Sequence, residues 1–110
     1  MNFYIGNSID KISEQNDNVE FSDDLINFIY KLRKKVPCDM SKLYGINPYS
    51  DVEIPKSDLF QIIEICEYIL NTFLLQDYED AEEGNQMLRD LVKISEKAIS
   101  KDLGLISIGD

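Results

Sequence analysis

The sequence predicts a mainly α-helical protein with three principal amphipathic helices in one compact domain, residues 1–110. Three stretches in which apolar residues recur every three or four positions predict this class, and the longest runs from Pro55 to Gln76. The length of 110 residues suits one domain with one core. An apolar content of 44% favours folding despite the high charge. We therefore expect a single acidic globular unit.

The central stretch is expected to form the helix against which the rest of the chain packs. Ser57 or Asp58 can cap its N-terminus, and Pro55 ends the preceding segment. Its apolar face is wide and comprises Leu59, Phe60, Ile62, Ile63, Ile65, Cys66, Ile69, Leu70, Phe73 and Leu74. A face of this width predicts neighbours on more than one side.

A second helix is expected from Ser22, its cap, to about Val36, where Pro37 ends the run. Cations are favourable near the C-terminus of a helix, and four of them occur there. They are Lys31, Arg33, Lys34 and Lys35. We interpret this basic group as a partner for the helix dipole rather than as a nucleic-acid contact, because the whole chain is acidic.

A third helix is expected to end at Lys101 and to begin at either Ala81 or Asn85, since Gly84 obscures its start. Gly104 follows closely enough to act as a left-handed C-terminal cap. This helix completes the predicted set of three.

The two terminal segments can add a small sheet to the helices. Residues 2–5 and the alternating tail 103–108 are predicted strands that can pair with each other. Ile9 and Ile12 fit a turn of helix or a second strand, and we expect 13–18 to be an exposed loop.

The charge balance restricts the classes of partner. Twenty-one acidic and 11 basic residues leave a net charge of −10, which repels nucleic acid and anionic membranes and favours a basic protein. The N-terminus lacks the features of a signal peptide, and no apolar stretch reaches the roughly 18 residues of a membrane span. Cys38 and Cys66 do not make a disulfide framework, so we expect reduced thiols and a cytoplasmic location.

The chain has little of the usual equipment of an enzyme. It contains no histidine and neither of the common glycine-rich phosphate loops. The acidic run fails the calcium-loop pattern, because Gly84 in the sixth position would place Ala81 in the third. We therefore expect no catalytic residue, cofactor or metal ion. Paired carboxylates leave a small enzyme or metal-binding domain as a further hypothesis.

One acidic run is the strongest candidate for a partner-binding surface. It consists of Asp77, Tyr78, Glu79, Asp80, Glu82 and Glu83. Such a run can be the solvated start of a helix, or it can dock lysines and arginines of a partner. Tyrosines suit the centre of an interface, and Tyr44, Tyr49, Tyr68 and Tyr78 are candidates.

The stretch GINPYSDVEIPKSDLFQIIEICEYI resembles a motif of bacterial immunity proteins from polymorphic toxin systems, including contact-dependent growth inhibition. The matching residues run from Ile46 to Asp51 and are followed by the expected helix. Asn47 stands where the motif has an acid, and Ser50 stands where it has a glycine. The resemblance covers about a quarter of the chain, and two residues within it, Tyr49 and Asp51, are candidate binding residues.

This resemblance implies an immunity protein that binds a basic cognate toxin domain, with a nuclease as the expected class, and blocks it by steric and electrostatic occlusion. An acidic inhibitor gains electrostatic steering toward a cationic cleft. The alternative is a DNA-mimic regulator or inhibitor of a nucleic-acid-binding protein, whose acids are spaced like phosphates.

Overall fold

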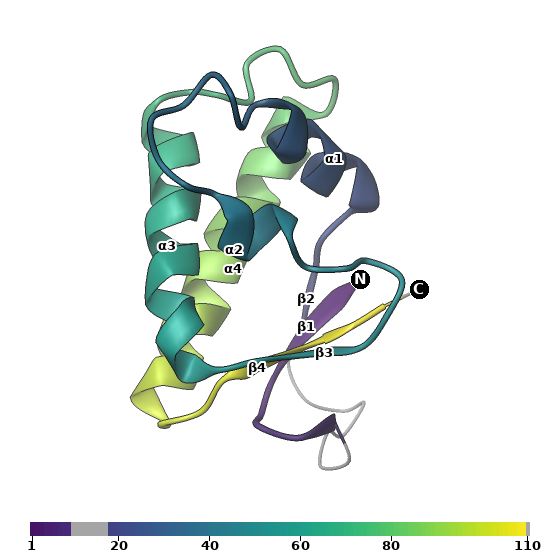
Figure 1. Ribbon diagram of the computed structural model, residues 1–110, viewed down its shortest axis with the longest axis vertical. Coiled ribbons are helices and arrows are strands. Elements are labelled where there is room, and N and C mark those ends of the chain that lie inside the picture. Colours follow the sequence, from purple (N-terminus) through teal and green to yellow (C-terminus); the bar gives the residue numbers. More distant parts are fainter. Residues whose placement is uncertain (10–17, 110) are drawn as a thin grey trace.

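Three long helices and a four-stranded antiparallel sheet form the described part of the computed structural model, residues 1–9 and 18–109 (Figure 1). The elements are β1 (Asn2–Ile5), β2 (Asn18–Glu20), α1 (Asp23–Lys31), α2 (Ser41–Tyr44), β3 (Val52–Ile54), α3 (Lys56–Asn71), α4 (Ala81–Ser100) and β4 (Leu105–Ile108). The prediction of a mainly helical fold with three principal helices and a small sheet is confirmed. The expectations for Ile12 and for residues 13–17 lie outside the described residues, whereas Asn18, expected to end a loop, is the first residue of β2.

The helices α3 and α4 lie side by side and run in opposite directions (Figure 1). Their facing apolar residues are among the most buried in the molecule, with Leu59, Ile69, Leu88 and Leu91 each 0% exposed. The helix α4 also contacts β1 and β2, so it lies between α3 and the sheet. The predicted central helix is therefore present, and α4 shares its role as the centre of the core.

The boundaries of α3 differ from the prediction at both ends. The helix begins at Lys56, directly after Pro55, so Ser57 and Asp58 lie inside its first turn instead of capping it. Because α3 ends at Asn71, Phe73 falls beyond it and is 74% exposed. Phe60 is also 52% exposed, so its assignment to the apolar face was wrong. The true apolar face is narrower than the sequence suggested.

The helices α3 and α4 end in the same way. Phe73 after α3 and Asp102 after α4 have φ angles of 56° and 59°, in the left-handed region. The amide of the next residue then donates to a carbonyl five positions back, from Leu74 to Ile69 and from Leu103 to Ala98. Asp102, and not Gly104, therefore provides the left-handed cap of α4. Gly104 serves a different purpose, because a Cβ at that position would overlap the carbonyl oxygen of Ile54 in β3.

The helix α1 begins as predicted and ends earlier than predicted. The Ser22 side chain accepts a hydrogen bond of 3.2 Å from the Leu25 amide, which confirms the cap. The helix ends at Lys31, so Arg33 lies outside it and its guanidinium carbon stacks 3.7 Å from the centre of the Tyr30 ring. Of the four expected cations, Lys31 is the one in the last turn.

The sheet has the strand order β2-β1-β4-β3, with antiparallel neighbours. The predicted pairing of the terminal segments is confirmed, with Asn2 opposite Ile108 and Ile5 opposite Leu105. The strands β2 and β3 and the short helix α2 were not predicted, because each has only three or four residues and shows no clear periodicity. No helix in the described part of the chain combines the length and the apolar character needed to span a membrane.

Candidate functional site

The predicted acidic run lies in the connection from α3 to α4 and in the first turn of α4 (Figure 1). Asp77, Glu79 and Asp80 are exposed on this connection. Leu75, which precedes them, is 0% exposed and anchors the connection to the core. The amide of Tyr78 donates to the Leu75 carbonyl at 2.9 Å, which closes a turn and directs the acidic side chains outward.

The side chain of Tyr78 packs between the rest of this connection and α1. Its ring packs against the ring of Phe28 with 4.9 Å between centroids and an angle of 53° between planes. Gly84 in α4 supports this position, since a Cβ there would come within 3.2 Å of the Tyr78 ring and 3.0 Å of Leu75 Cδ1. The absence of a side chain at Gly84 lets the connection pack closely on α4.

The connection and α1 enclose a hollow of about 440 Å³, which we call the acidic hollow. Its lining residues are Asp24, Asn27, Phe28, Lys31, Asp77, Tyr78, Glu79 and Asp80. Four of these are carboxylates and one is a cation, so the hollow carries a net negative charge. The contact between the two rings supplies apolar surface within it. Such a hollow suits a cationic side chain with an aliphatic stem.

The sequence analysis found the half of this hollow that lies on one continuous segment and missed the half on α1. The missed residues have a helical signature, because positions 24, 27, 28 and 31 share one face of a helix. That spacing was visible in the sequence. Nothing local indicated that this face meets residues 77–80.

Glu82 and Glu83 belong to the first turn of α4 and are exposed, and they are not among the residues that line the hollow. Their carboxylates lie near the positive end of the α4 dipole, where negative charge is favourable. They extend the acidic surface beyond the hollow.

Tyr49 and Asp51 lie elsewhere, in the loop between α2 and β3 that Figure 1 shows beside the chain termini. Tyr49 is 69% exposed, and its amide donates to Asn47 Oδ1 at 2.9 Å. Asp51 Oδ1 accepts a hydrogen bond of 3.1 Å from the Gly109 amide. The structure therefore does not bring these two residues together with the acidic hollow. Asn47, which departs from the acid of the resembled motif, here closes the turn.

The other two candidate tyrosines are partly buried. The Tyr44 ring packs edge-on against Tyr30 with 5.3 Å between centroids, so it helps to join α2 to α1. Tyr68 lies on α3. Among the described residues, no group of three acids or cysteines is arranged to hold a metal ion. Cys38 and Cys66 are both free thiols.

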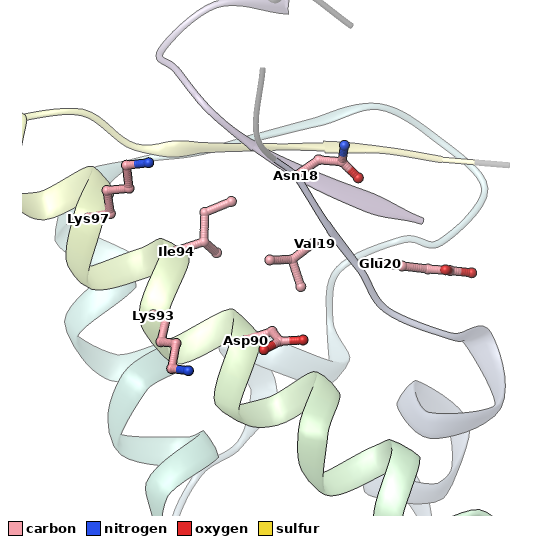
Figure 2. Close-up of a pocket in the computed structure, with 7 residues that line it drawn as sticks. All are labelled: Asn18, Val19, Glu20, Asp90, Lys93, Ile94 and Lys97. Atoms are coloured by element: carbon pink, nitrogen blue, oxygen red, sulfur yellow. The ribbon is translucent and has the colours of Figure 1, made fainter. Parts of the chain in front are cut away.

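A second pocket, of about 370 Å³, lies between β2 and α4 (Figure 2). Val19 and Ile94 point toward each other across it, whereas Glu20 points away. Its charged lining residues are Glu20, Asp90, Lys93 and Lys97. Two acids and two bases balance, so this pocket lacks the negative charge of the acidic hollow.

Comparisons of the chain with protein-family models, with curated proteins and with solved structures gave no match. The function is therefore argued from the charges and geometry of the chain and from the motif at residues 46–51.

Proposed function

We propose that this protein is an immunity protein that binds a cognate bacterial toxin of the nuclease class in the cytoplasm and covers its active site. The acidic hollow carries this proposal. It places four carboxylates around an aromatic contact on a protein with a net charge of −10. The resemblance of the segment 46–51 to immunity proteins supports the same conclusion.

The physical basis is complementarity to a cationic cleft. A nuclease must attract phosphate, and the lysines and arginines that do so also attract an acidic inhibitor. Steering of this kind raises association rates by about 10- to 1,000-fold at low salt. An inserted arginine or lysine can pack its stem on the Phe28 and Tyr78 rings while its charge meets the carboxylates. Occupation of the cleft then excludes the nucleic acid.

The proposal is tested by co-expressing the protein with the product of the gene directly upstream and measuring binding and nuclease inhibition. Replacing the three acids of the connection, Asp77, Glu79 and Asp80, with lysine should weaken binding at least about 100-fold, since it places cations opposite cations. It should also reduce the salt dependence of the association rate.

A matched control has the same change in charge at a distance from the hollow. Glu53, Glu67 and Glu96 are exposed on β3, α3 and α4, and none of them lines the hollow. Replacing these three with lysine should slow association modestly through the change in net charge. Equal effects of the two triple variants would show that the hollow is not the binding surface. If the wild-type protein neither binds nor inhibits the upstream product, the immunity function itself is wrong.

A further inference from the structure

A groove of about 340 Å³ separates α3 from the segment that leads into α2. It is lined by Cys38, Asp39, Gln61, Glu64, Ile65 and Tyr68. The four α3 residues are three or four positions apart, so they form one face of the helix. The groove shares no residue with the acidic hollow, so it forms a separate feature of the surface.

The groove has acids on both sides and an apolar base. Asp39 projects from the segment before α2, and Glu64 from α3. Hydrogen bonds from the Ser41 hydroxyl and amide lower the pKa of Asp39, so its carboxylate is charged at neutral pH. Ile65 is only 3% exposed, and with the Tyr68 ring it supplies the apolar surface between the two acids.

None of the described residues that line the groove is a cation. The acidic hollow contains Lys31, and the pocket between β2 and α4 contains Lys93 and Lys97. Lys42, the nearest lysine in sequence to Asp39, pairs with Asp58 at 3.5 Å and does not line the groove. After the hydrogen bonds from Ser41, the charge of Lys42 also lowers the pKa of Asp39, so this lysine attracts one carboxylate of the groove from outside its lining.

We propose that this groove docks an arginine side chain of a basic protein. A guanidinium group is planar, stacks on aromatic rings and can donate to two carboxylates at once. In this groove its face would lie on Tyr68, its donors would reach Asp39 and Glu64, and its stem would cover Ile65. A lysine ammonium satisfies the charge but neither stacks as well nor forks between two acceptors. This site is independent of the proposed immunity function and of the acidic hollow.

Cys38 reports on the occupancy of the groove. Its thiol is partly exposed in the lining, whereas Cys66 is 0% exposed and its pKa is raised to about 12 by burial. A thiol reagent such as iodoacetamide should therefore modify Cys38 alone in the folded protein. A ligand in the groove should slow this reaction, and a ligand in the acidic hollow should not.

The test measures the alkylation rate of Cys38 in the full chain while an acetylated and amidated four-arginine peptide is titrated in. With free peptide at about twice its Kd, the rate should fall about threefold, because only the unoccupied protein reacts. Replacing Glu64→Gln should raise the Kd about two- to fivefold, as expected for loss of an exposed ion pair. Replacing Tyr68→Leu should remove the preference for arginine over lysine peptides.

Glu67→Gln is the matched control, because Glu67 is exposed on the same helix and does not line the groove. In this variant the arginine peptide should slow the alkylation of Cys38 as much as it does in the wild type. An alkylation rate that the arginine peptide leaves unchanged would overturn the proposal. Equal effects of Glu64→Gln and Glu67→Gln would also overturn it, since they would indicate general attraction to an acidic surface. Equal protection by a four-lysine peptide would rule out arginine docking.

Discussion

The ring of Tyr78 packs against the ring of Phe28, with 4.9 Å between their centroids. This contact joins the connection between α3 and α4 to α1, a segment distant in sequence. It also positions the carboxylates on either side of the acidic hollow. The proposed binding surface therefore depends on one aromatic pair as well as on its acids.

A double-mutant cycle tests the energy of that pair. Phe28→Ala and Tyr78→Ala should each lower the free energy of unfolding by about 1–3 kcal/mol, because both side chains are partly buried. The double variant should reveal a coupling of about 0.5–1.5 kcal/mol. Urea denaturation gives the free energy of unfolding of the wild type, the two single variants and the double variant. Tyr78→Phe is the control that keeps the ring contact, and additive single effects would contradict the contact.

Gly104 is expected to tolerate no side chain. Gly104→Ala should lower the free energy of unfolding by about 1–3 kcal/mol, because the new Cβ overlaps the Ile54 carbonyl oxygen and must displace β3. Gly6→Ala provides a comparison, since its Cβ would lie 3.8 Å from Ile106 Cγ1, an ordinary contact. Thermal unfolding of the two variants should separate them clearly. Equal melting temperatures would disprove the close approach.

Phe73 offers a route to stabilisation. It is 74% exposed and has a left-handed φ of 56°, a conformation that costs a residue with a side chain about 1–2 kcal/mol and glycine much less. Phe73→Gly should therefore raise the free energy of unfolding by about 1 kcal/mol, measured by chemical denaturation. Phe60→Ala, also at an exposed phenylalanine but within α3, should change it by less than about 0.5 kcal/mol. A loss of stability in Phe73→Gly would mean that the ring packs on the surface.

The buried thiol of Cys66 predicts a loss of stability at high pH. Burial raises its pKa from 9.0 to about 12, so the unfolded chain releases this proton at a lower pH than the folded chain. The contribution of this thiol to the free energy of unfolding is complete below pH 9. It falls by about 1.4 kcal/mol per pH unit between pH 9 and pH 12. Denaturation curves at pH 8–11 should show that the free energy of unfolding declines less steeply with pH in Cys66→Ala than in the wild type. This holds whatever the stability of the variant is at pH 8. Parallel declines would contradict the assignment.

Features that depend on local sequence were predicted well. The period of apolar residues placed three helices, and Ser22 was recognised as a cap because a short polar side chain before an apolar run satisfies the first free amides. The helix ends were predicted less well. Apolar periodicity continues past Asn71 to Phe73 and Leu74, and only the backbone shows that the chain turns left-handed there.

The sequence by itself determined the helical class, the pairing potential of the two terminal strands and the strong negative charge, since each depends on composition or on short-range spacing. The tertiary structure alone decided that the face of α1 with Asp24 and Phe28 meets residues 77–80. It also decided that the loop between α2 and β3, which carries Tyr49 and Asp51, does not line the acidic hollow, and that Glu64 and Asp39 line one groove. The physical reason is that such contacts are made between segments whose individual patterns carry no information about each other. Packing of the whole core selects which surfaces meet.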